Sequence, residues 1–295
     1  MAWIFEKITH RGEEAAEICG FDGVRTVLTM PEEIGGLPVR RVARRAFEGQ
    51  KELKQITLPD TLVSVGEFAF YGCTGLKFLS LSDTPEDLGD GMIRACGSLR
   101  ELELRVRKRS FRAARDLLSD TDAALYLRLQ FPDGEALLFF PAFVNDFDED
   151  TMARAIHPRI EGCGYAYREM VTRTAVNFAG YDAIFPRAAA DGVPAAVETA
   201  LSRLRYPYRL SKEAGTAYER WLQENSRAAV RRLTELSDEP RIRFLAERGL
   251  ITPEAAGDSI DIAAEAGQNG ILGILMECEH AGHAGNAPAA DEFEL

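Results

Sequence analysis

The stretch Ala69-Phe70-Tyr71-Gly72-Cys73-Thr74-Gly75-Leu76-Lys77-Phe78-Leu79-Ser80-Leu81 decides the fold, because related stretches lie 23 positions before it and 23 positions after it. One copy begins at Ala46-Phe47-Glu48-Gly49 and another at Ile93-Arg94-Ala95-Cys96. The apolar positions recur at the same step, in the series Leu53, Leu76, Leu99 and Ile56, Leu79, Leu102. A fixed period of this length predicts a solenoid of stacked repeats.

Each repeat contains a short stretch in which apolar and polar residues alternate, the pattern of a β-strand with two different faces. In Gln55-Ile56-Thr57-Leu58 the aliphatic side chains point to one side and the polar side chains to the other. Stacked copies therefore predict a parallel ladder with an aliphatic interior and an outer strip. In register, that strip reads Val27, Thr29, Gln55, Thr57, Phe78, Ser80, Glu101 and Glu103.

These repeats resemble the bacterial BspA-type leucine-rich repeat. The likeness is carried by Ile56-Thr57-Leu58-Pro59, by Val65 to Cys73 and by Leu76 to Leu79, and it extends over about residues 20–105. The resemblance implies a short horseshoe-like solenoid used for protein recognition. The chain departs from the family in having few repeats and in replacing the Ala-Phe pair of the third copy with Met92-Ile93.

A solenoid this short needs a cap at each end. Trp3 to Ile8 reads as a strand, whereas Glu14 to Cys19 is compatible with a strand or a helical turn; the family resemblance favours a strand. We therefore expect an N-terminal hairpin that covers the first open edge of the ladder.

The outer strip is the candidate binding site, and we expect it to contact an unidentified protein through six residues. Phe78 is a large ring in a polar column, and aromatic residues are enriched at binding hot spots. Two alternatives stay open: Phe78 packs under a neighbouring segment, and the glutamates are only solvated. The six candidate residues are Gln55, Thr57, Phe78, Ser80, Glu101 and Glu103.

Composition narrows the class of protein. The chain has 295 residues, the usual apolar and charged fractions of a globular protein and a formal net charge of -12, so general binding to nucleic acid or to an anionic membrane is unfavourable. The first residues hold too few apolar side chains for a signal peptide, which predicts a cytoplasmic protein. The five scattered cysteines do not form a disulfide pattern, and Cys73 and Cys96 should stack as buried thiols in adjacent repeats.

Beyond Leu104 the repeat register ends. Two alternating runs flank Pro132-Asp133-Gly134-Glu135 and predict a β-hairpin over about 124–140, placed to dock beside the last solenoid strand. The basic stretch 105–115 is compatible with a phosphate-binding or nucleic-acid role or, alternatively, with a linker and a solvated helix face.

Several chemical motifs fail on inspection. A calcium loop from Asp146 has Thr151 and His157 where glycine and glutamate belong, and the acids of 145–150 fit a loop and helix start better. His157 and Cys163 suggest a thiol–imidazole pair, but the sequence does not bring them together. The glycines of 162–164 do not have the order of a phosphate-binding loop. The spacing of Cys278, His280 and His283 does not fit a standard metal site. We therefore expect no metal and no cofactor.

The remainder is mainly helical, with apolar residues three and four apart. Ser211 and Thr252-Pro253 are expected to begin helices. Ile260 to Gly267 followed by Ile271 to Glu277 resembles the helix pair of an ankyrin repeat, which implies a second binding module. The fold expected is thus α+β: a solenoid with its hairpin cap at 1–105, a mainly helical domain at 106–280 containing the β-hairpin, and a flexible tail at 281–295.

Three functions remain. The first is a non-catalytic protein–protein interaction scaffold, which both repeat resemblances favour. The second is an enzyme whose site is assembled in the helical domain from His157, Cys163 or the acids near Asp148. The third is a nucleic-acid-linked regulator that uses residues 105–115. The sequence identifies neither the partner nor the oligomeric state.

Overall fold

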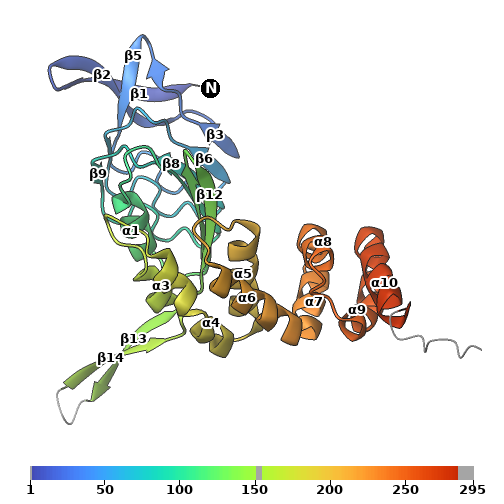
Figure 1. Cartoon of the computed structure of the whole chain (residues 1–295). Helices are drawn as coiled ribbons and strands as arrows, with labels where there is room; N and C mark the ends of the chain where they lie inside the picture. Colours follow the sequence, from blue (N-terminus) through green and yellow to red (C-terminus); the bar gives the residue numbers. More distant parts are fainter. Residues whose placement is uncertain (1, 151–154, 285–295) are drawn as a thin grey trace, which may run out of the picture. The chain divides into compact units, whose positions relative to one another are not determined.

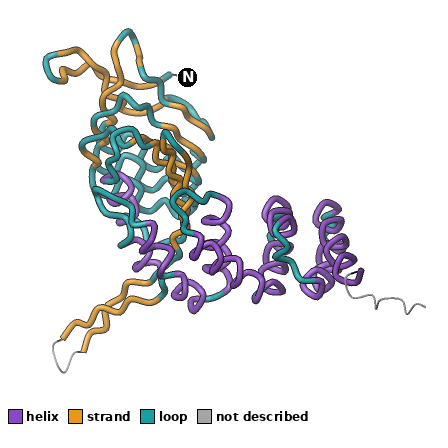
Figure 2. The backbone as a smooth tube through the Cα atoms, viewed as in Figure 1, coloured by secondary structure: helices purple, strands orange, loops and turns teal. Residues whose placement is uncertain are grey.

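The computed structural model describes residues 2–150 and 155–284, and the chain forms two compact units (Figure 1). The first contains Met1–Asp191 and Arg205–Leu210, and the second contains Gly192–Leu204 and Ser211–Leu295. The first unit is mostly strand and loop and the second is helical (Figure 2).

The 23-residue repeats stack into one parallel ladder, which we call sheet B. Its strand order is β12-β11-β10-β8-β6-β3, and its register places Ile56 beside Leu79 and Leu79 beside Leu102. All three side chains have no exposed surface, so the predicted aliphatic interior is confirmed. The repeat strands are β3 (Val27–Thr29), β6 (Gln55–Thr57), β8 (Phe78–Ser82) and β10 (Glu101–Arg105).

A second sheet, sheet A, runs along another side of the coil in the order β1-β2-β5-β7-β9. The predicted N-terminal hairpin is confirmed, since β1 and β2 pair antiparallel. The hairpin covers the edge of sheet A through a parallel β2–β5 pairing, whereas β3 forms the edge of sheet B. The strands are β1 (Trp3–His10), β2 (Glu13–Phe21), β4 (Glu33–Ile34), β5 (Leu37–Val42), β7 (Ser64–Val65) and β9 (Asp87–Leu88).

Identical side chains stack between adjacent repeats. The rings of Phe47 and Phe70 lie parallel with centroids 5.2 Å apart, and Trp3 of the hairpin meets Phe47 edge-on at 6.2 Å. The coil is tight at Gly89, where an added Cβ would lie 2.1 Å from the main-chain nitrogen of Glu67. Only glycine can occupy such a position without moving the neighbouring repeat.

Sheet B continues past the repeats. The predicted hairpin consists of β11 (Leu125–Phe131) and β12 (Gly134–Phe140), which pair antiparallel. Strand β11 pairs parallel with β10, so the hairpin extends the ladder. The boundary expected at 105/106 therefore differs from the structure, in which the first unit reaches Asp191. The cause is the open edge of β10, whose main-chain groups are satisfied by β11.

Two local expectations were wrong. Residues 145–150, expected as a loop and helix start, belong to β13 (Val144–Asp150), which pairs with β14 (Ala155–Glu161). Ladder pairing with β14 thus overrides the helix-dipole preference of the acids. A glycine-rich turn at 162–164 also suggests a helix from about Tyr165 to Phe178, but the structure has only the short helix α2 there, followed by a loop up to the start of α3. The helices of the first unit are α1 (Arg112–Ser119), α2 (Gly164–Arg168), α3 (Phe178–Ala183) and α4 (Phe185–Asp191).

The second unit consists of helices that pack as stacked pairs, with α7 against α9 and α8 against α10. The predicted caps are present: Ser211 accepts from the amide of Ala214 at 3.1 Å, and Thr252 accepts from that of Ala255 at 3.2 Å. Helix α10 continues beyond the expected start of the tail at 281, and residues 285–295 lie outside the described part. The helices are α5 (Val193–Arg205), α6 (Lys212–Glu224), α7 (Ser226–Glu235), α8 (Glu239–Glu247), α9 (Pro253–Glu265) and α10 (Asn269–Ala284).

Candidate protein-binding face of the solenoid

The outer face of sheet B carries two rows of side chains that run across the strands. The structure brings all six predicted residues together on this face with Val27 and Thr29 of the predicted strip, and it adds Tyr126 and Arg128 of β11. Their binding role stays a prediction. One row is Val27, Gln55, Phe78, Glu101 and Tyr126, and the other is Thr29, Thr57, Ser80, Glu103 and Arg128.

On β3, β6 and β8 the face is uncharged and accessible; we call Val27, Thr29, Gln55, Thr57 and Phe78 the open half. Val27 is 56% exposed, Thr29 and Gln55 are exposed, and Thr57 and Phe78 are half-buried. Among the described residues, none of these five side chains takes part in a hydrogen bond or ion pair. This half of the face thus offers polar and apolar groups that remain available to a partner.

On β10 and β11 most of the outer side chains are charged; we call Glu101, Glu103, Arg105 and Arg128 the charged half. Arg128 Nε donates to Glu101 at 2.6 Å, and one of its terminal nitrogens donates to Glu135 on β12. The guanidinium also lies 5.2 Å from the ring centroid of Tyr206. Burial lowers the pKa of Arg128, but the hydrogen bonds that it donates to Glu101 and Glu135 outweigh this effect, so the pKa is raised.

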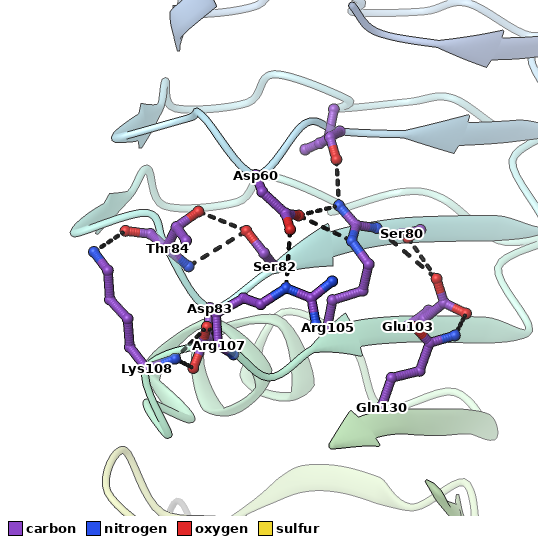
Figure 3. Close-up of polar contacts among 11 residues, drawn as sticks. Asp60, Ser80, Ser82, Asp83, Thr84, Glu103, Arg105, Arg107, Lys108 and Gln130 are labelled. Carbon is purple, nitrogen blue, oxygen red and sulfur yellow. Dashed lines mark hydrogen bonds and ion pairs between the residues drawn. The ribbon is translucent and has the colours of Figure 1, made fainter. Parts of the chain in front are cut away.

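Arg105 organises the rest of the charged half (Figure 3). Its Nε donates to Asp60 at 3.0 Å, and a terminal nitrogen contacts the hydroxyl of Ser80. Ser80 in turn donates to Glu103 at 2.7 Å, and Gln130 donates to the other oxygen of Glu103 at 2.8 Å. Ser80 is consequently only 1% exposed, which corrects the expectation that it lies on the surface.

The basic stretch 105–115 folds over the protein's own acids (Figure 3). Arg107 donates to Asp60 at 3.0 Å. Burial raises the pKa of Asp60, but Arg105 and Arg107 more than offset it and leave that pKa lowered. The carboxylate of Asp83 accepts main-chain N–H bonds from Arg107, Lys108 and Ser110. These contacts reduce the basic field that binding to phosphates would need.

Of the residues His157, Cys163 and Asp148 proposed for catalysis, Cys163 is the one whose side chain the structure describes. Cys163 is buried, and burial followed by the nearby Asp191 raises the pKa of its thiol to about 12, so the nucleophilic thiolate is scarce at neutral pH. His157 lies on β14 opposite Asp148, and the side chains of both lie outside the described part of the chain.

The cysteines behave as expected within the repeats. Cys73 and Cys96 are free and buried, and their thiols donate to the carbonyls of Phe47 and Phe70 at 3.0 and 3.1 Å. Burial raises the pKa of Cys73 to about 11 and that of Cys96 to about 12. Equivalent contacts one repeat apart show that both thiols are structural.

In the described ranges one further set of ligand-type atoms converges, on the N-terminal hairpin. Atoms of Glu6, Glu17 and Cys19 lie within 4.8 Å of one another, and Arg41 already pairs with Glu17 at 3.2 Å. No motif in the sequence indicates this set, because its members lie on two different strands. Of the C-terminal candidates, Cys278 and His280 lie on α10, and the side chain of His283 is outside the described residues.

Parallel ladders, buried aliphatic columns and a fixed repeat define a β-solenoid of the leucine-rich-repeat class. Residues 38–114 match the family described as BspA type leucine-rich repeat region (6 copies), so this part of the chain is a BspA-type leucine-rich repeat region. Such repeats are in general modules of protein interaction. The ankyrin likeness of the C-terminal helix pair stays a prediction.

Three solved structures are similar to parts of the chain. A leucine-rich cell surface protein from Faecalibacterium prausnitzii A2-165 is 23% identical over 38% of this chain and 33% of that chain, with a TM-score of 0.29. The T. pallidum leucine-rich repeat protein is 19% identical over 43% and 78%, with a TM-score of 0.24. A Bacteroides ovatus ATCC 8483 leucine-rich repeat protein is 14% identical over 45% and 53%, with a TM-score of 0.22.

The chain thus spans about a third of the length of the first of these proteins. A search of curated protein sequences found no match. In the ranges that the structure describes, no helix combines the length and apolar character needed to cross a membrane.

Proposed function

We propose that this protein is a non-catalytic scaffold that binds another protein through the outer face of sheet B. Gln55, Thr57 and Phe78 form the centre of the contact, together with Val27 and Thr29. Ser80, Glu101 and Glu103 form its rim, where they hold the shape of the face. The match of residues 38–114 to a repeat family used for protein interaction supports this proposal.

One observation carries the proposal: on one continuous sheet, the outer side chains of the charged half bind one another, whereas those of the open half do not. The charged half is neutralised internally, by Arg128 with Glu101 and by Arg105 with Asp60. In the part of the chain that the structure describes, the side chains of the open half carry no charge and make no hydrogen bonds, so a partner gains contacts there without displacing existing ones. Binding should therefore depend on Phe78 and its neighbours and respond weakly to salt.

The helical unit is proposed as a second interaction module. A short turn joins α7 to α8, and another joins α9 to α10. Ser237 and Gly267 lie at matching positions of these two turns, and both have a left-handed backbone conformation. Gln268 of one turn donates to the carbonyl of Thr234 in the preceding pair at 3.0 Å. Repeated pairs joined by such contacts favour an α-solenoid of ankyrin-like type.

A site-specific photo-cross-link tests the binding face. A benzophenone amino acid replaces Gln55, an exposed residue on β6, and in a matched control it replaces Asp87, an exposed residue on β9 of sheet A. Irradiation in a native lysate should give a discrete cross-linked protein from position 55 that is absent from position 87. The same products from both positions, or none from position 55, would contradict the proposal.

A further inference from the structure

A cavity of about 480 Å³ lies in the first unit, apart from the outer face of sheet B. It is bordered by α1, the turn that follows it, the start of β13 and α2. Its volume is in the range of pockets that take small organic ligands. Its walls include Arg168, Asp122, Phe143 and Tyr165.

Arg168 is an unusual wall residue because it is charged and only 4% exposed. Its guanidinium donates to three main-chain carbonyls, those of Pro141 at 2.7 Å, Gly164 at 3.1 Å and Ala123 at 2.6 Å. Carbonyl groups satisfy hydrogen bonds but bring no negative charge. The remaining donor Nε is buried without a hydrogen-bond partner among the described residues.

The charge of Arg168 is therefore not neutralised within the described residues. Burial lowers its pKa to about 10, against the opposing effects of Asp122 and Cys163. Burying an unpaired charge is costly, and such groups are normally found with a counter-ion. Asp122, which also lines the cavity, is exposed and forms no ion pair with Arg168.

The other charges of the cavity cancel in pairs. Arg115 meets Glu169 at 2.8 Å, and Arg94 lies 3.7 Å from Asp120. Arg168 is left as the cation without a counter-ion and Asp122 as an acid that reduces the local positive potential. An anion entering the cavity would find its favourable interaction at Arg168.

Part of the remaining wall is aromatic. The guanidinium of Arg168 lies 4.8 Å from the ring centroid of Phe143, and Phe143 and Tyr165 meet edge-on with centroids 5.7 Å apart. Tyr165 is exposed to 42% and borders the cavity. A buried guanidinium beside two rings suits a planar carboxylate that carries an apolar or aromatic group.

We propose that this cavity binds a small aromatic carboxylate, with Arg168 as the partner of the carboxylate group and Phe143 and Tyr165 against the ring. The negative charge of Asp122, at the rim of the cavity, weakens the binding of the carboxylate. The site is independent of the protein-binding face, because it shares no residue with it.

Benzoate and its neutral analogue benzamide are the probes, titrated against the full chain while the side-chain Nε–H signals of arginine are followed by ¹H–¹⁵N NMR. Benzoate should bind at least about tenfold more tightly than benzamide, because only benzoate forms a charge-assisted pair. The Arg168 signal should shift with the same saturation curve. Equal affinities, or the absence of saturable benzoate binding up to about 10 mM, a weak-fragment ceiling, would overturn the proposal.

Variants separate a ligand site from a purely structural clamp. Arg168→Met should abolish the preference for benzoate, but the lost carbonyl contacts endanger folding. Asp122→Asn avoids that difficulty because Asp122 is exposed. It should tighten benzoate binding about threefold, as expected for removal of one screened like charge, and leave benzamide binding unchanged. If benzoate affinity does not change or falls in Asp122→Asn, the proposal is wrong.

Discussion

The two halves of the outer face of sheet B share one backbone ladder but differ in what their side chains do. Gln55 and Phe78 project from β6 and β8 without hydrogen bonds or ion pairs among the described residues. On β10, the strand next to β8, Glu101 and Glu103 are held by Arg128, Ser80 and Gln130. A repeat therefore fixes where a side chain lies, while its neighbours decide whether it is available for binding.

The difference follows from what each half borders. The open half belongs to the regular repeats. The charged half meets β11, which is not a repeat strand but pairs with β10. Arg128 comes from that added strand, and Arg105 extends from the end of β10 to Asp60. The outer side chains next to β11 are therefore engaged in ion pairs, whereas those of the repeat strands β3, β6 and β8 remain available for binding.

The largest effect should come from removing the arginine at the centre of the charged half. Arg105→Met leaves Glu103 without its cation and leaves Asp60 with Arg107 as its remaining cation, in a partly buried setting. We therefore expect a loss of about 2–3 kcal/mol in the free energy of unfolding. Urea unfolding followed by circular dichroism measures it. Arg44→Met is the control, since the Arg44–Glu67 pair is exposed and should be nearly neutral. If both substitutions lower the free energy of unfolding by the same amount, the ion pairs of the charged half do not stabilise the fold more than an exposed ion pair does.

A smaller, pH-dependent effect should appear at Asp60. Because the folded-state pKa of Asp60 is below its ordinary value of 3.8, the carboxylate stabilises the folded protein above pH 3.8 and loses this contribution as the pH falls through the folded-state pKa. Asp60→Asn should therefore be less stable than the wild type at pH 7, and the gap should narrow at lower pH. Unfolding midpoints in urea between pH 7 and pH 2.5 test this. A gap that is constant with pH would speak against the pairing.

The repeat architecture could be predicted because it depends on a short period that the sequence states three times. Ile56, Leu79 and Leu102 lie at one position of that period, so their stacking followed directly. The docking of the hairpin at 124–140 also followed, since an alternating pair of strands next to an open ladder edge has an obvious place to pair. Both are local patterns joined by a regular step.

The parts that could not be predicted depend on residues that are far apart in sequence and follow no period. Arg105 and Asp60 are 45 positions apart, and Arg105 also contacts the buried Ser80, 25 positions away. Residues 205–210 return to the first unit, where Tyr208 stacks on Phe131 at 4.3 Å. One sequence feature could have indicated that Arg105 reaches these residues. Arg105 lies two residues beyond Glu103 on the same strand, so its side chain points to the same outer face as that of Glu103.

The proposed binding face is tested most directly by affinity for the partner identified by cross-linking at position 55. Surface plasmon resonance with the purified partner would compare wild type, Gln55→Arg plus Phe78→Ala, and Glu101→Lys. The open-half variant should bind at least about 30-fold more weakly, equivalent to about 2 kcal/mol, whereas Glu101→Lys should change the affinity less than about threefold. Unchanged affinity of the open-half variant, or a larger loss from Glu101→Lys, would contradict the proposed face.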